Sequence, residues 1–204
     1  NKLLEIGREL IEQRLPRSWL QQLYRRLLIY SFSESRRVGL LLSIARRFRP
    51  LLPTQLKKRI PLVVNTADAR PRTQARSMLL LDGCVQPAAA PHINKLAIQV
   101  FDRLGIQLRT IAESGCCGAL QHHLADSEGA RHRARSNIDA WWPVVEQGAE
   151  AIVVTATGCT PMIKDYRHLL RDDEQYAERA QRISAMTKDL SEVLSREDLS
   201  ELSP

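Results

Sequence analysis

The stretch "MLLLDG", residues 78–83, decides the fold class of this chain. A short apolar run that ends in Asp-Gly is typical of a strand buried on both faces of a parallel sheet. Residues 106–112, "IQLRTIA", alternate in polarity as a second strand would, and residues 150–158, "EAIVVTATG", form a third apolar run. The sequence therefore predicts three strands from residue 78 onward.

Helical patterns separate and follow these strands. Residues 88–104 carry apolar side chains at helical spacing, and a long helix is predicted from about Ser127 to Gln147, with Asp126 or Ser127 as its cap. A further helix opens with "TPMIKDYRHLL", residues 160–170. Alternating strands and helices imply right-handed crossovers. We therefore expect an α/β fold with a Rossmann-like, mainly parallel sheet and flanking helices.

The amino-terminal part of the chain differs from the rest in charge. Residues 1–77 contain 17 Lys and Arg against 5 Asp and Glu, a net +12, whereas residues 78–204 contain 13 against 18, a net −5. Residues 17–30, "RSWLQQLYRRLLIY", place their apolar side chains on one helical stripe, and a second helix is predicted from about Val38 to Phe48. Such asymmetry indicates two regions with different surroundings.

We therefore expect three parts in the chain. Residues 1–77 form a helical, basic connecting segment whose last part, residues 61–77, is an extended linker. Residues 78–171 form the α/β domain, and residues 172–204 form a helical, polar C-terminal extension.

Composition limits the classes of function. No run of about 18 apolar residues and no secretory signal pattern is present, so we expect a cytoplasmic protein without a spanning helix. The basic segment could meet nucleic acid, an anionic membrane surface or an acidic partner, or it could simply be solvated. Aromatic residues make up only 5% of the chain, and no nucleic-acid-reading motif occurs, so we expect no nucleic-acid partner.

The four cysteines of the chain each follow a predicted strand. Cys84 follows the first, Cys116 and Cys117 follow the second, and Cys159 follows the third. Because ligands bind outside the carboxyl ends of parallel strands, we expect the four thiols to lie together at that edge. Soft thiolate donors suit iron–sulfur clusters and other soft metals. Glycines flank these cysteines and would let the backbone approach a bulky group: Gly83, Gly115, Gly118 and Gly158.

Other readings of the cysteines remain open. Free cysteines are often small buried hydrophobes, and a dithiol can act in redox chemistry without a metal. A thiolate zinc site usually takes CxxC pairs, which this chain lacks, and a disulfide framework is unexpected in a chain with four cysteines and no secretory signal. Beyond the double cysteine, His122 is a candidate hydrogen-bond donor to a cluster sulfide, or else a partly exposed polar residue.

Three stretches resemble the cysteine-rich CCG domain shared by the B subunit of heterodisulfide reductase and related oxidoreductase subunits, among them the iron–sulfur subunits of bacterial glycolate oxidases. They are "GCVQPAAAPHINKLAIQVFDRLG", "ESGCCGALQHHL" and "NIDAWWPVVEQGAEAIVVTATGC". The resemblance covers roughly residues 78–170. The family's CxxCxxCxxxCP run and a second CCG motif do not occur here, so the chain resembles an internal piece of such a subunit.

The resemblance implies an electron-transfer role. It implies a [4Fe–4S] cluster on Cys84, Cys116, Cys117 and Cys159, within a flavin-dependent oxidase of glycolate or another 2-hydroxy acid. The FAD and the substrate chemistry would lie on a partner flavin subunit, so this chain would not itself be catalytic. Electrons would pass toward a quinone-type acceptor, with peripheral association at the inner face of the cytoplasmic membrane as a further expectation.

One position departs from the family pattern. Domains of the heterodisulfide reductase type end in CxxC, whereas the corresponding element here reads Cys159-Thr160-Pro161-Met162. A thioether is a poorer ligand for iron than a thiolate. The alternative function is therefore a metal-free CCG scaffold domain that mediates subunit assembly.

Overall fold

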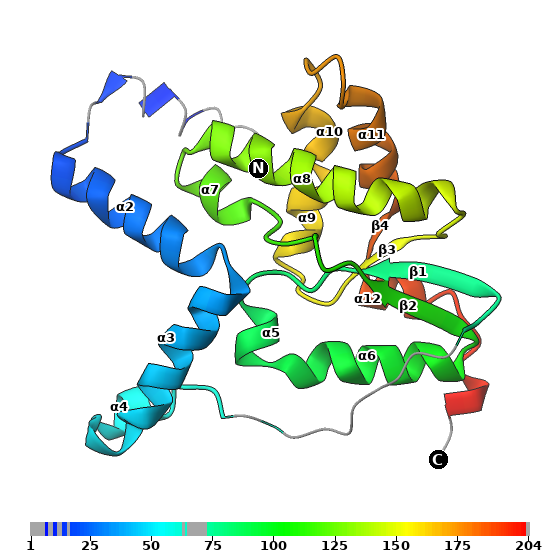
Figure 1. Ribbon diagram of the computed structural model, residues 1–204, viewed down its shortest axis with the longest axis horizontal. Helices are drawn as coiled ribbons and strands as arrows, with labels where there is room; N and C mark the ends of the chain where they lie inside the picture. The colour runs from blue at the N-terminus through cyan, green and yellow to red at the C-terminus, as the bar shows by residue number, and fades with distance from the viewer. Residues whose placement is uncertain are drawn as a thin grey trace.

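A four-stranded, all-parallel β-sheet forms the centre of the molecule (Figure 1). The structure is a computed structural model that describes residues 7, 10–11, 14–15, 17–62, 64 and 73–202. The strand order is β2-β1-β3-β4. The strands are β1 (Arg76–Leu80), β2 (Ile106–Thr110), β3 (Ile152–Val154) and β4 (Thr187–Asp189).

Helices cover both faces of this sheet. In Figure 1, α6 (Pro91–Arg103) lies on one side of the strands and α8 (Ser127–Glu146) on the other. The remaining helices of this part are α5 (Gln86–Ala89), α7 (Ala119–His123), α9 (Cys159–Lys164), α10 (Tyr166–Leu169), α11 (Ala177–Met186), α12 (Leu190–Leu194) and the 3₁₀ turn η2 (Ser200–Leu202). The expected α/β class with a parallel sheet is confirmed.

Alternation along β1 divides the core into two layers. Leu79 and Leu81 pack on the α8 side, in a cluster that also contains buried residues of α9, α10 and α11. Met78 and Leu80 point to the opposite face and pack with Phe101 of α6. Successive strand residues face opposite sides of a sheet, so a strand that is apolar throughout is covered on both faces. This is why "MLLLDG" identifies the fold.

The structure corrects several predicted boundaries. The tail after residue 172 is not helical throughout, because Thr187–Asp189 form β4, which pairs in parallel with β3. The third strand is limited to Ile152–Val154, shorter than the predicted 150–158. The predicted helix at 88–104 is two helices, α5 and α6, and the one at 160–170 is α9 and α10. The division of the chain into three parts stays a prediction.

The predicted long helix is confirmed almost residue for residue. It is α8, and Asp126 caps it by accepting a hydrogen bond from the Gly129 amide at 3.0 Å. Trp141 on this helix is fully buried in the core, and Trp142 packs against the same hydrophobic cluster.

Residues 17–59, which we call the basic arm, contain α2 (Trp19–Phe32), α3 (Ser35–Arg47), the 3₁₀ turn η1 (Arg49–Leu51) and α4 (Thr54–Lys57). The two helices predicted here are confirmed as α2 and α3. Most of the predicted linker, residues 61–77, lies outside the described residues, and its last two residues belong to β1. In the described part of the chain, no helix has the length and apolar character needed to cross a bilayer.

Candidate metal centre

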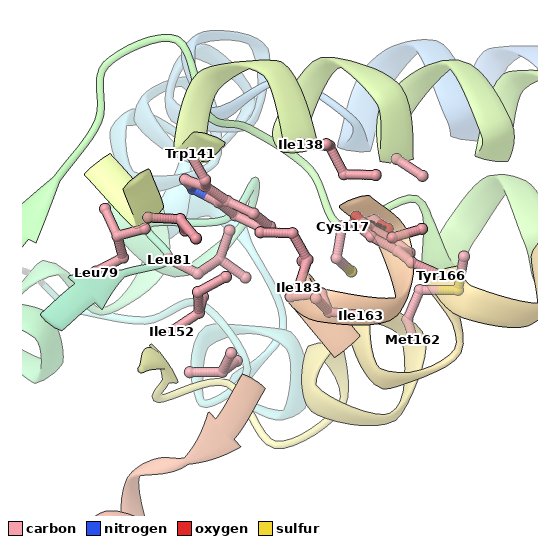
Figure 2. Close-up of a cluster of buried hydrophobic side chains, with 14 of the residues drawn as sticks. Leu79, Leu81, Cys117, Ile138, Trp141, Ile152, Met162, Ile163, Tyr166 and Ile183 are labelled. Atoms are coloured by element: carbon pink, nitrogen blue, oxygen red, sulfur yellow. Dashed lines mark hydrogen bonds between the residues drawn. The ribbon is translucent and has the colours of Figure 1, made fainter. Parts of the chain in front are cut away.

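The four cysteines lie on three turns at the carboxyl edge of adjacent strands. Cys84 follows β1, Cys116 and Cys117 follow β2, and Cys159 begins α9 after β3. The strand order places β2, β1 and β3 side by side, so the three turns are neighbours in space. Cys116 and Cys117 are buried, at 2% exposure each, and the other two are half-buried. Figure 2 shows Cys117 among Ile138, Ile163 and Tyr166.

The four thiols form a continuous series of interacting neighbours. Cys84 interacts with Cys116, Cys116 with Cys117, and Cys117 with Cys159. Interaction with Cys117 and then with Cys84 lowers the pKa of Cys116, and Arg133 adds to this effect. Interaction with Cys117 also lowers the pKa of Cys159. The pKa values of Cys84 and Cys117 are raised, because each hydrogen bonds to Cys116 and is partly desolvated. The two cysteines with lowered pKa values, Cys116 and Cys159, therefore alternate along the series with the two whose pKa values are raised, Cys84 and Cys117.

Two side chains from the α8 side hold the backbone of the double-cysteine turn. Asn137 Oδ1 accepts from the Gly115 amide at 2.9 Å, and its Nδ2 donates to the Cys116 carbonyl at 3.0 Å. The Tyr166 hydroxyl donates to the Cys117 carbonyl at 2.8 Å and accepts from Asn137 Nδ2 at 3.0 Å. Asn137 and Tyr166 are both buried, so these hydrogen bonds are shielded from water. The turn is thus fixed independently of its thiols.

The first cysteine turn is held by a separate polar network. Asn94 of α6 donates to the carboxylate of Asp82 at 2.8 Å and accepts from Thr155 Oγ1 at 2.6 Å. Gln86 of α5 donates to Asn94 Oδ1 at 2.6 Å. Asp82 precedes Cys84 by two residues, and Thr155 follows β3. The network therefore ties the turns after β1 and β3 to each other.

Gln121 links the site to the basic arm. Its Oε1 lies 4.0 Å from Cys116 Sγ, and its Nε2 donates to Ser33 Oγ at 3.0 Å. Gln121 and Ser33 are both buried, and Ser33 caps the C-terminus of α2. Arg133 of α8 reinforces this junction by pairing with Glu34 at 2.7 Å.

The glycines fall into two groups. Gly118 has a φ of +87°, and a Cβ added there would lie 3.3 Å from the Ala130 carbonyl oxygen. Gly83 also has a positive φ, +76°. Gly115 and Gly158 have ordinary backbone angles, and an added Cβ would find no described heavy atom within 4 Å. Gly118 is therefore required by the fold, whereas Gly115 and Gly158 leave open space beside the thiols.

The donor set fits an iron–sulfur cluster better than a single metal ion. Four soft sulfur donors converge from three turns, and open space adjoins two of these turns. Over the described ranges, no three His, Cys, Asp or Glu side chains surround one point at which a single ion could be held. An iron–sulfur cluster takes its protein ligands on several iron atoms, whereas a single ion needs all its ligands around one point. A series of neighbouring thiols therefore suits a cluster better than a single ion.

The other predicted site residues occupy different surroundings. His122 lies on α7, half-buried, with its ring 5.9 Å from that of His123; a role beside a cluster stays a prediction. Met162 is 7% exposed and packs in the core beside Ile163 and Tyr166 (Figure 2). A cavity of about 420 Å³ reaches Cys116 from the side of the basic arm, and its lining is largely polar.

Asn137, Tyr166 and Gln121 were not predicted from the sequence. The available signal for Asn137 was an amide within the apolar stripe of α8, in register with Ala130, Ala134 and Trp141. Buried polar side chains nearly always have a hydrogen-bond partner, so such an amide indicates a specific contact.

Comparison with known proteins gives consistent matches. Residues 78–164 match the family model described as a cysteine-rich domain, CCG. The chain is 39% identical over 205 residues to the glycolate oxidase iron–sulfur subunit of Escherichia coli (strain K12), covering 99% of this chain and 50% of that protein. It is 27% identical over 127 residues to the probable glycolate oxidase iron–sulfur subunit of Bacillus subtilis (strain 168), covering 62% and 28% of the two chains.

A third relative has a different name. The chain is 25% identical over 111 residues to lactate utilization protein A of Bacillus cytotoxicus, covering 54% of this chain and 44% of that protein. The chain thus spans about half the length, or less, of these curated relatives. No solved structure matches it.

Proposed function

We propose that this chain, whose residues 78–164 match the CCG cysteine-rich domain family model, holds an iron–sulfur cluster and transfers electrons within an oxidoreductase. The observation that carries the proposal is the series of four neighbouring thiols on three adjacent turns, two of them on a backbone fixed by Asn137 and Tyr166. The similarity to proteins named as iron–sulfur subunits supports it.

Each residue of the centre has a definite task in this proposal. Cys84, Cys116, Cys117 and Cys159 supply the thiolates, and the bound cluster, of the [4Fe–4S] type, supplies one-electron transfer. Asn137 and Tyr166 hold the Cys116 and Cys117 carbonyls of the double-cysteine turn by donating hydrogen bonds to them. The buried apolar side chains of the hydrophobic core that contains Cys117 exclude water from this turn. Their presence sets the polarity around the sulfur atoms.

The wider assignment extends to partners. The names of the relatives indicate glycolate and lactate, which are both 2-hydroxy acids. We propose that a partner subunit with FAD oxidises such an acid and that this chain passes the electrons toward a quinone-type acceptor at the inner face of the cytoplasmic membrane. In that arrangement this chain sets distance and potential and does no acid–base chemistry.

One observation favours a second candidate, a metal-free scaffold that joins subunits. Met162 stands where the family pattern has a second cysteine, and its side chain is committed to the core. If the cluster needed a fifth sulfur ligand, Met162 could supply it only by leaving this packing.

Anaerobic reconstitution with iron and sulfide tests the two candidates. We expect the full chain to take up about four iron and four sulfide per molecule, with visible absorption and a reduced-state EPR signal. Replacing Cys116 or Cys159 with Ser should abolish most of this uptake. Met162→Leu is the matched control, because it conserves core volume and should load as the unaltered chain does.

A colourless, EPR-silent product with less than one iron per chain would overturn the electron-transfer proposal and leave the scaffold. Loss of the cluster in Met162→Leu, with its unfolding free energy unchanged, would instead assign Met162 a role as ligand.

A further inference from the structure

The basic arm presents apolar side chains to the outside. On α2, the six residues Trp19, Leu20, Leu23, Tyr24, Leu27 and Tyr30 are exposed by 46 to 69%. At 100° per residue they occupy a single arc of the helix. On α3 and just after it, Leu40, Leu41, Ile44 and Phe48 are exposed by 43 to 64%. Exposed apolar side chains gathered on one arc of a helix, rather than scattered singly, indicate a binding surface.

The opposite side of the arm is fixed to the rest of the molecule. Arg25 of α2 donates to the Leu124 carbonyl at 3.0 Å, and Arg46 of α3 donates to the Ala88 carbonyl at 3.2 Å. Val38 is buried where α3 packs against α5. These contacts orient both helices, so their apolar arcs are held outward and are not available to the core.

The charge of the arm is almost entirely of one sign. Residues 17–59 contain eleven Lys and Arg against one acidic residue, Glu34, a net +10. The single carboxylate is already paired with Arg133. Residues 78–204 carry a net −5 and include the cysteine site. An anionic surface would therefore attract the basic arm and repel residues 78–204. The chain would then approach such a surface with the arm facing it.

We propose that the basic arm is a membrane-binding element that lies on an anionic lipid surface. Such a surface offers negative headgroups and, just beneath them, an apolar layer, and it matches both properties of the arm at once. Trp and Tyr rings such as Trp19, Tyr24 and Tyr30 favour the headgroup level because each has an apolar ring and a polar tip. An acidic protein surface would match the charge but would also need an apolar area of the same extent.

Vesicle binding by the full chain tests this proposal directly. We expect co-sedimentation with vesicles of equal parts phosphatidylglycerol and phosphatidylcholine, at least tenfold stronger than with pure phosphatidylcholine, and weakened by 0.5 M salt. Trp19 is 69% exposed, whereas Trp141 is fully buried. Brominated acyl chains should therefore quench part of the tryptophan fluorescence, and Trp19→Phe should remove that quenchable part.

Substitutions on the arm and on the sheet-bearing part form matched pairs. Leu23→Gln with Leu27→Gln should lower the partition coefficient at least tenfold, and Arg26→Gln with Arg47→Gln should lower it about fivefold for each charge removed. Leu96→Gln and Arg103→Gln, two exposed positions on α6, are the controls and should leave binding unchanged.

Three outcomes would overturn the proposal. One is equal or absent binding to both kinds of vesicle. Another is lipid binding that the arm variants and the α6 controls weaken alike. The third is a lipid-free dimer, seen by sedimentation velocity, that Leu23→Gln with Leu27→Gln dissociates, since the apolar face would then be covered by a second copy. The inference rests on the membrane location given in the proposed function, and none of these measurements depends on cluster loading, so failure of lipid binding and failure of cluster binding are distinguishable.

Discussion

Asn137 and Tyr166 determine where two of the four sulfur atoms lie. Together they hold the Gly115 amide and the carbonyls of Cys116 and Cys117. Burial raises the pKa of Tyr166 well above its ordinary value, so its hydroxyl remains a donor across the physiological range. Leaving a buried backbone group without its partner costs about 1–3 kcal/mol. The turn is thus ordered by neutral hydrogen bonds that do not depend on the charge of the thiols.

The first prediction concerns Gly118. Gly118→Ala should lower the free energy of unfolding by about 2 kcal/mol, because alanine is strained at a φ of +87° and its Cβ would press on the Ala130 carbonyl. Urea unfolding followed by circular dichroism measures this change. Gly115→Ala is the control, because its backbone angles are ordinary and its Cβ would meet open space. Equal losses in the two variants would contradict this account of the turn.

At the residue scale, the sequence was sufficient to find the cysteines but not their supports. Each cysteine follows an apolar run, and parallel topology brings the ends of such runs together. Asn137 and Tyr166 lie 20 to 50 residues after the double cysteine and make contacts that only the packing of α8 against α10 defines. Local patterns carry no information about such a contact beyond the presence of an amide in an apolar stripe.

At the element scale, β4 is the feature that connects the C-terminal segment with the site. Asp189, at the end of β4, caps α12 in a capping box with Glu192 and accepts a hydrogen bond from Thr160 of α9 at 3.3 Å. Lys164 at the end of α9 pairs with Glu192 at 2.6 Å. The helix that begins with Cys159 is therefore held by the C-terminal segment. Sequence patterns missed β4 because "TKD" is three residues long and mostly polar.

The second prediction concerns pH and the ion pairs of Arg76 at the start of β1. Arg76 bonds Glu197 at 2.7 Å and Glu150 at 2.8 Å, and the hydrogen bond from Arg76 lowers the pKa of Glu197. A carboxyl whose folded pKa is depressed stabilises the fold above its unfolded pKa of about 4.3, and this contribution is lost as pH falls through the folded value. Glu197→Gln should therefore cost about 1 kcal/mol at pH 7, after allowance for solvent screening.

Urea unfolding from pH 7 to pH 3 checks this prediction. The difference between Glu197→Gln and the unaltered chain should be constant above about pH 5 and should shrink at lower pH. Glu150→Gln is the control and should cost less, because Glu150 is 37% exposed whereas Glu197 is 16% exposed. A difference that grows toward acid pH would contradict the assignment.

At the scale of the whole molecule, the fold has two parts with different chemistry. Both core clusters lie entirely between Met78 and Val193, whereas the basic arm contributes Ser33 and Val38 to the buried residues. The arm meets the rest mainly through polar contacts such as Gln121 with Ser33 and Arg133 with Glu34. Charge composition differs between residues 1–77 and the rest of the chain, but the predicted three-part division stays a prediction. It could not predict how the arm is docked, since that depends on individual side chains.

The third prediction follows from this division. Residues 73–204 on their own should fold and unfold cooperatively, with a free energy of unfolding about 2–4 kcal/mol below that of the full chain, from the loss of Val38 burial and the Ser33 hydrogen bond. Thermal and urea unfolding measure the change. Ser33→Ala in the full chain should account for about 1 kcal/mol of it. A broad unfolding transition of residues 73–204, without a native-state baseline, would show that the basic arm is part of the folding unit.

The hydrogen bonds from Asn137 and Tyr166 to the double-cysteine turn can form only at a late stage of synthesis of the chain. Cys116 and Cys117 leave the ribosome before Asn137 and Tyr166, and Cys159 and β4 follow later still. The nascent polypeptide therefore exposes its adjacent thiols before anything positions them, and they are vulnerable to oxidation in that interval. Under the electron-transfer proposal, a cluster on all four thiols can form only after Cys159 has been synthesised, and the double-cysteine turn is fixed only after Tyr166 has followed.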